Sequence, residues 1–104
     1  MASILSITVM DCGPQSDAVR REVEEAFRAS LIEIFGSEEN VWNHYQAANE
    51  LTETYGEYPL PKEAAPLEKS VTDTWYLAEC KAARAAFADW IRYPESAHFD
   101  IRHI

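Results

Sequence analysis

The sequence predicts a mainly α-helical single domain of three helices, together with a short two-stranded sheet formed by the N- and C-terminal strands. Two observations predict this fold. Apolar residues recur at helical spacing over three long stretches, and a short β-branched or alternating segment lies at each end. The chain has 104 residues and is 47% hydrophobic, which is enough for one domain with its own core. We therefore expect residues 1–104 to fold as one unit.

The two ends of the chain are the predicted strands. Residues 4–10 read I-L-S-I-T-V-M and are soon followed by a Gly-Pro pair, a pattern typical of a strand that ends in a turn. Its alternation places Leu5, Ile7 and Val9 on one side. Residues 98–103 read H-F-D-I-R-H, and their early alternation favours an edge strand that pairs with the first. This pairing would bring the two termini together.

The first predicted helix covers about residues 16–35. Ser16 or Asp17 can cap its start, and Gly36 provides a left-handed stop. The apolar side chains between these signals recur at helical steps and predict one buried stripe. That stripe consists of Val19, Val23, Ala26, Phe27, Leu31, Ile34 and Phe35.

The second predicted helix covers residues 38–55, with Ser37 as its cap and Gly56 at its end. Its apolar face consists of Val41, Tyr45, Ala48, Leu51 with Thr52, and Tyr55. Residues 57–66 contain three prolines. They predict an ordered loop beside this helix, because proline lacks the backbone donor that a regular helix needs.

The third predicted helix covers about residues 70–92, since it should begin between Pro66 and Asp73 and end before Pro94. Its bulky apolar stripe consists of Tyr76, Cys80, Ala83, Phe87, Trp90 and Ile91. A flanking row of small residues consists of Ala78, Ala82, Ala85 and Ala86. Such a row lets another helix approach closely.

The charge of the chain is concentrated in its middle third. The net charge is −9, and residues 33–68 hold eight Glu against a single Lys. This charge disfavours direct binding to nucleic acid or to an anionic membrane, because both surfaces would repel it. It suits a basic partner surface, or it serves only to keep the protein soluble.

The surplus acid has a helical pattern, which we call the acidic ridge. It consists of Glu39, Asn43, Gln46, Glu50, Glu53 and Glu57, spaced at steps of three and four. If the last helical turn persists to Glu57, the ridge is roughly 27 Å long at 1.5 Å per residue. Trp42 lies off the apolar face and Tyr58 follows the helix, so both are candidates for aromatic residues at the rim of an interface.

In its small size and its row of acidic and amide side chains, the chain resembles the small acidic phage-encoded inhibitors. This class includes anti-CRISPR proteins and other nucleic-acid mimics. The resemblance implies a non-enzymatic inhibitor whose Glu ridge stands in for phosphates and blocks a basic, nucleic-acid-binding surface of a protein or complex. The expected binding residues are the acidic ridge, Trp42 and Tyr58.

Two other functions remain open. The small-residue row of the third helix could dock an assembly subunit, with the acid serving solubility alone. Alternatively, Cys12-Gly13-Pro14 lies between a predicted strand and a predicted helix, as in the thioredoxin-like redox proteins, which this short motif resembles. Gln15 stands where those proteins have their second cysteine, and Asp11 would raise the thiol pKa.

Other chemistry finds little support in the sequence. His98 and His103 would point to opposite faces of a strand, and His44 has no neighbour at ligand spacing, so we expect no metal and no cofactor. The carboxylate pairs lie on helix surfaces, where nothing gives the two members of a pair the different pKa values that acid–base catalysis needs. We therefore expect no enzyme. Two cysteines and no visible signal peptide or membrane span indicate a cytoplasmic protein.

Overall fold

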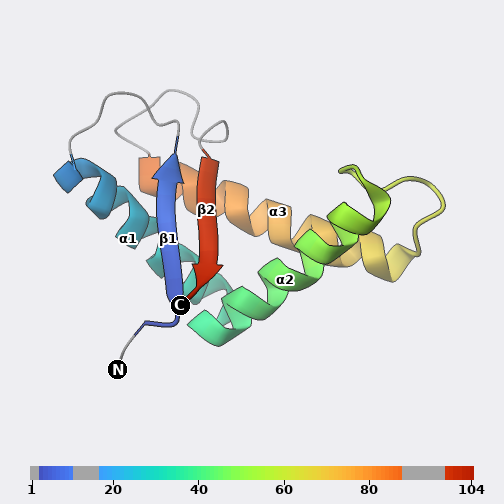
Figure 1. Cartoon of the computed structure of the whole chain (residues 1–104), viewed down its shortest axis with the longest axis horizontal. Coiled ribbons are helices and arrows are strands. Elements are labelled where there is room, and N and C mark those ends of the chain that lie inside the picture. The colour runs from blue at the N-terminus through green and yellow to red at the C-terminus, as the bar shows by residue number, and fades with distance from the viewer. Residues whose placement is uncertain (1–2, 11–16, 88–97) are drawn as a thin grey trace.

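The structure is a computed structural model, and it describes residues 3–10, 17–87 and 98–104. Its elements are β1 (Leu5–Met10), α1 (Asp17–Phe35), α2 (Glu38–Tyr55), α3 (Pro66–Phe87) and β2 (His98–His103) (Figure 1). The predicted fold class, with three helices and a sheet of the two terminal strands, is confirmed. No helix within the described ranges is long and apolar enough to cross a membrane.

The two strands form an antiparallel pair in which Leu5 lies opposite His103 and Val9 lies opposite Phe99. At the open end of the pair, the amide of Ile104 donates a hydrogen bond to the carbonyl of Ile4 at 2.8 Å. The side chains of β1 alternate as predicted: Leu5, Ile7 and Val9 are buried, whereas Ser6 and Thr8 are exposed.

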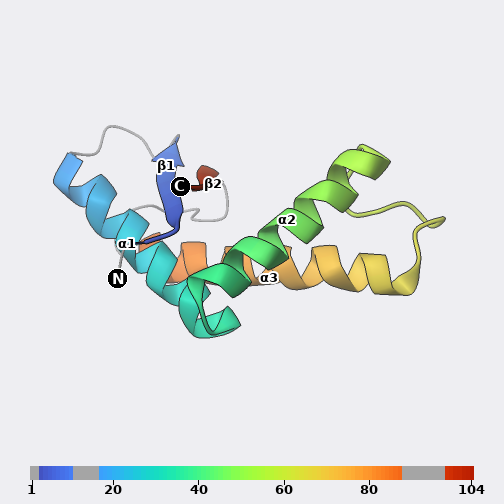
Figure 2. The same cartoon turned by 60° about the horizontal axis from the view of Figure 1, so that its bottom comes forward.

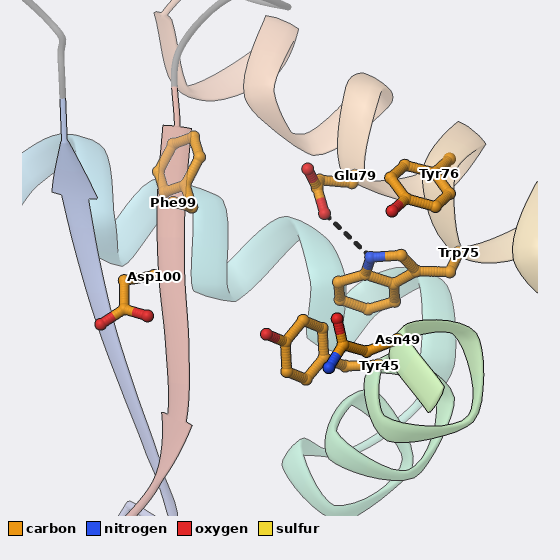
Figure 3. Close-up of a pocket in the computed structure, with 7 residues that line it drawn as sticks. All are labelled: Tyr45, Asn49, Trp75, Tyr76, Glu79, Phe99 and Asp100. Carbon is orange, nitrogen blue, oxygen red and sulfur yellow. Dashed lines mark hydrogen bonds between the residues drawn. The ribbon is translucent and has the colours of Figure 1, made fainter. Parts of the chain in front are cut away.

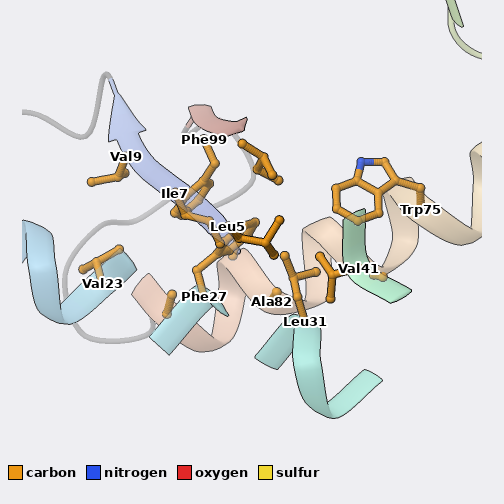
Figure 4. Packing of buried hydrophobic residues seen from close by; sticks show 14 of the residues in the cluster. Leu5, Ile7, Val9, Val23, Phe27, Leu31, Val41, Trp75, Ala82 and Phe99 are labelled. Carbon is orange, nitrogen blue, oxygen red and sulfur yellow. The ribbon is translucent and has the colours of Figure 1, made fainter. Parts of the chain in front are cut away.

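The helices α1 and α3 cover one face of this sheet (Figure 2). The core between them is centred on Phe27 of α1, which is fully buried and stacks on Phe99 of β2 with ring centroids 3.6 Å apart. Val23 and Leu31 extend the same stripe along α1 (Figure 4). Hydrophobic burial therefore ties the terminal strands to the helices.

The predicted stripe of α1 is wrong at Ala26 and Ile34, which are exposed. The buried face is rotated toward Glu24 and Arg28, because β1 lies along that flank of the helix. The Glu24 carboxylate accepts a hydrogen bond from the amide of Val9 at 2.8 Å. The Arg28 guanidinium donates one to the carbonyl of Leu5, also at 2.8 Å. Polar side chains of α1 thus satisfy part of the outer edge of β1.

The helix α2 runs away from the sheet, a loop reverses the chain at its far end, and α3 runs back to the sheet (Figure 1). Its cap residues behave as predicted. The Ser37 hydroxyl accepts a hydrogen bond from the amide of Asn40 at 3.1 Å. Gly56 ends the helix with a left-handed φ of 75°, and its amide donates to the carbonyl of Thr52. In the following loop, Leu60 is buried.

The helix α3 begins at Pro66, the first position of the predicted range from Pro66 to Asp73. Proline is suited to the first position of a helix, where its missing donor costs nothing. The Glu68 carboxylate then accepts a hydrogen bond from the amide of Ala65 at 2.9 Å, which is one half of a capping box. The predicted end near residue 92 lies outside the described residues.

The buried face of α3 also differs from the prediction. The small-residue row is buried at Ala78, Ala82 and Ala86, next to the buried Trp75. In the bulky stripe Ala83 is buried, Tyr76 and Cys80 are only half-buried, and Trp90, Ile91 and the side chain of Phe87 lie outside the described residues. The reason is that α1 supplies the large side chains of this interface, so α3 fits against it with small ones. Apart from the exposed Ala85, the row that was a candidate docking face for another subunit is occupied by the chain itself.

Candidate functional site

The acidic ridge is a solvent-facing feature of α2. Glu39, Asn43, Gln46, Glu50, Glu53 and Glu57 are all exposed. Glu57 is not part of the helix, because Gly56 reverses the backbone before it. The helical part of the ridge therefore runs from Glu39 to Glu53, about 21 Å at 1.5 Å per residue.

The two predicted rim aromatics lie at opposite ends of this helix. Trp42 is half-buried and contacts the rings of Tyr45 and His103, with centroids 5.6 and 5.4 Å away. Tyr58 stacks on Tyr76 of α3 at 4.0 Å, and its hydroxyl donates to the carboxylate of Asp73 at 3.1 Å. Trp42 thus contacts the end of β2, whereas Tyr58, in the loop after α2, packs against α3.

Four of the predicted residues are brought together by an open hollow of about 310 Å³ on one flank of the ridge, here called the outer hollow. It is lined by Trp42, Tyr45, Gln46, Asn49, Glu50 and Glu53. The other predicted residues lie elsewhere. Asn43 lines a separate hollow on the other flank of α2, with His44, Ala47 and Val71.

A second hollow, here called the inner hollow, lies where β2, α2 and α3 meet (Figure 3). It has a volume of about 240 Å³ and is lined by Tyr45, Asn49, Trp75, Tyr76, Glu79, Phe99 and Asp100. Tyr45 and Asn49 line both hollows, so the two form one continuous surface. Sequence patterns do not reveal the inner hollow, because its carboxylates, Glu79 and Asp100, come from two different elements.

Four carboxylates line the two hollows, and one of them, Asp100, is paired with Arg102 at 2.8 Å. Their lining includes the carboxylates of Glu50, Glu53, Glu79 and Asp100 and contains no Lys or Arg. Burial raises the pKa of the Tyr45 phenol above its ordinary value of 10.0, and the charges of Asp100 and Glu79 raise it further.

Other acids of the chain have structural roles. The Glu38 carboxylate accepts hydrogen bonds from the Ser3 hydroxyl at 2.5 Å, the Ile4 amide at 3.0 Å and the Arg28 guanidinium at 2.9 Å. Glu68 accepts from the Tyr55 hydroxyl at 2.8 Å in addition to capping α3. These carboxylates hold segments of the fold together and are not part of the candidate surface.

The described residues contain no group of three or more His, Cys, Asp or Glu side chains that could hold a metal ion. His44 stacks on Phe35 at 4.4 Å. Cys12 with its Gly-Pro neighbours lies outside the described residues, as does the side chain of His98. Cys80 is a half-buried free thiol in α3.

Comparisons with known proteins found no relative of the chain. No protein-family model matches it, and no curated protein or solved structure is significantly similar to it.

Proposed function

We propose that the chain is a non-enzymatic protein-binding inhibitor whose acidic ridge engages a basic surface of its partner. One observation carries this proposal. The ridge carboxylates Glu39, Glu50 and Glu53 are exposed, and within the part of the chain that the structure describes none of them forms an ion pair with Lys or Arg. Carboxylates that the fold leaves uncompensated are available to cations of another protein.

The partner surface in this proposal is one that binds nucleic acid, as in the anti-CRISPR class that the chain resembles. Such mimicry depends on how closely the spacing of the ridge carboxylates matches that of nucleic-acid phosphates. Three ridge carboxylates over about 21 Å give one charge per roughly 7 Å, about half the density of a single nucleic-acid strand with one charge per 3.4 Å. The ridge alone therefore reproduces the charge of a nucleic-acid strand only in part.

The test uses two variants of equal charge. Glu39, Glu50 and Glu53 are changed to Gln in the first, and Glu22, Glu33 and Glu63 in the second. All six side chains are exposed. The tagged wild-type protein captures its partner from a lysate of its native host, and the bound proteins are eluted with a salt gradient. We expect the partner to elute early from the ridge variant and at the wild-type position from the control, because only ridge charges contact it.

A second elution identifies the type of surface. Duplex DNA or structured RNA added at low salt should release the partner if the ridge occupies its nucleic-acid-binding groove. If the ridge variant retains its partner as tightly as the wild type, the ridge is only a solvated face and the proposal is wrong. A complex that resists high salt would instead indicate an apolar interface.

A further inference from the structure

The solvent-facing side of α3 carries a patch with an apolar centre, here called the α3 patch. It consists of Asp73, Thr74, Leu77 and Lys81 of α3 and Ile34 of α1, all of which are exposed. Leu77 is 71% exposed and Ile34 is 38% exposed. Both line an open hollow of about 310 Å³, together with Thr74, Ala78 and Lys81. Because two large apolar side chains border one hollow, a molecule that covered it would remove contiguous apolar surface from water.

The exposed side of α3 also differs in charge from that of the other helices. Among its described residues, α3 exposes one acid, Asp73, and two bases, Lys81 and Arg84. By contrast, α1 exposes four acids and one base, and α2 exposes three acids and no Lys or Arg. The chain as a whole has a net charge of −9. Contact between two copies is therefore least opposed at α3, since exposed charges more than about 8 Å away are screened at physiological salt.

The charges of the α3 patch are placed symmetrically about Leu77. Asp73 lies four residues before Leu77, and Lys81 lies four residues after it. Each charge is thus displaced by about 6 Å along the helix at 1.5 Å per residue. The Asp73 carboxylate accepts a hydrogen bond from the Tyr58 hydroxyl and keeps its charge. Within the described part of the chain Lys81 forms no ion pair, so both charges are available to another molecule.

We propose that two copies of the chain associate through the α3 patch, with their α3 helices antiparallel and a two-fold axis at Leu77. In a two-fold contact, a residue i that meets a residue j of the other copy is itself met as j by i. The axis packs Leu77 against its equivalent and sets Lys81 of each copy against Asp73 of the other. A parallel arrangement would instead set Lys81 against Lys81 and Asp73 against Asp73. The charge pattern therefore selects the antiparallel pair.

The packing of the two helices is of a common kind. Asp73, Leu77 and Lys81 form one row at intervals of four residues, and such a row on one helix fits into the groove beside the same row on another. The hollow next to Leu77 is that groove. Since the contact covers only a few turns of one helix, we expect a transient dimer with a dissociation constant on the order of 10–100 µM. No residue of the acidic ridge belongs to the α3 patch, so the dimer does not depend on the proposed function.

Sedimentation equilibrium of the full-length protein tests the association, from micromolar to millimolar concentration at physiological salt. We expect the average mass to rise from that of one chain to that of two and no further, because a two-fold contact closes on itself. A protein that stays monomeric at millimolar concentration would overturn the proposal. Assemblies larger than two chains would also overturn it, since they require a head-to-tail contact.

Two charge reversals, Lys81→Asp and Asp73→Lys, test the pairing. In a dimer of either variant like charges meet at both positions, so we expect its affinity to fall by about tenfold or more. An equimolar mixture of the two variants should dimerise about as well as the wild type, because opposite charges face each other again in the mixed dimer. Circular dichroism checks that each variant is folded, and Lys81→Glu with Asp73→Arg replaces a pair that is not. Folded variants that stay monomeric when mixed would refute the antiparallel pairing.

Arg21→Asp is the matched control. It changes the net charge by the same amount as Lys81→Asp, at an exposed position of α1 outside the α3 patch. We expect its dimer affinity to stay within about twofold of the wild type. An equal loss in both variants would show that net charge alone governs association, and the pairing would be wrong. Leu77→Ser should weaken the dimer by about tenfold or more, and an unchanged affinity would rule out an axis at Leu77.

Discussion

Glu38→Gln should destabilise the fold through the N-terminal strand, and the effect should depend on pH. The carboxylate joins the Ser3 hydroxyl, the Ile4 amide and the Arg28 guanidinium. Hydrogen bonds to a charged group contribute about 1.5–3 kcal/mol in protected sites. The Glu38 side chain is 21% exposed, so we expect a loss near the lower end, about 2 kcal/mol at neutral pH.

The pH dependence follows from the pKa of Glu38. Burial raises this pKa, but the hydrogen bonds from Ser3, Ile4 and Arg28 and the charge of Arg28 outweigh burial and hold it below the ordinary value of 4.5. A carboxyl with a lowered pKa in the folded state contributes stability above its unfolded pKa, and that stability is lost as the pH falls through the folded value. The difference between wild type and variant should therefore shrink below pH 4.5.

The assay is urea unfolding followed by circular dichroism, at neutral pH and again well below pH 4.5. Glu39→Gln is the matched control, because Glu39 also lies in the first turn of α2 but is exposed. Both substitutions remove the same favourable interaction with the helix dipole, so the control should lose no more than about 0.5 kcal/mol. Equal stability of the two variants at neutral pH would refute the role given to the Ser3–Glu38–Arg28 cluster.

Two further substitutions test the fold. Phe27→Ala removes the fully buried ring that stacks on Phe99 and should lower the free energy of unfolding by about 3–5 kcal/mol, measured by urea denaturation. A loss below about 1 kcal/mol would contradict the packing of the strands on α1. Gly56→Ala should cost about 1–2 kcal/mol in thermal unfolding, because Gly56 has a left-handed φ of 75°. An added Cβ would meet no atom within 4 Å, so an unchanged melting temperature would contradict the backbone conformation itself.

Local signals in the sequence were sufficient for most of the fold. The ends of α2 follow from Ser37 and Gly56, whose roles depend only on neighbouring residues. The strand pair follows from alternation at the two ends of the chain. Which face of α1 and α3 is buried could not be predicted in the same way. The burial of Ala82 and the exposure of Ile34 depend on the relative size of side chains that two helices bring together, and periodicity does not reveal it.

The candidate surface, too, could be predicted from the sequence only where it lies on a single helix. Periodicity identified the ridge, because Glu39, Glu50 and Glu53 lie on one helix and are exposed. It could not identify the inner hollow, since Glu79 and Asp100 belong to α3 and β2 and approach Tyr45 only after folding. Its place in the sequence just after α2 groups Tyr58 with Trp42, yet the Tyr58 ring stacks on Tyr76. Residues from different elements can be assigned to one site only when the packing is known.

The acids of the middle third divide into two groups with different physical roles. Glu38 and Glu68 accept hydrogen bonds that hold the N-terminal strand and the start of α3, and both have a lowered pKa for that reason. Glu50 and Glu53 are exposed on the ridge, and neither forms an ion pair with Lys or Arg in the part of the chain that the structure describes. Charge needed only for solubility could be spread over any surface. The ridge carboxylates are instead aligned along one helix, and this alignment is why we propose that they bind a basic partner.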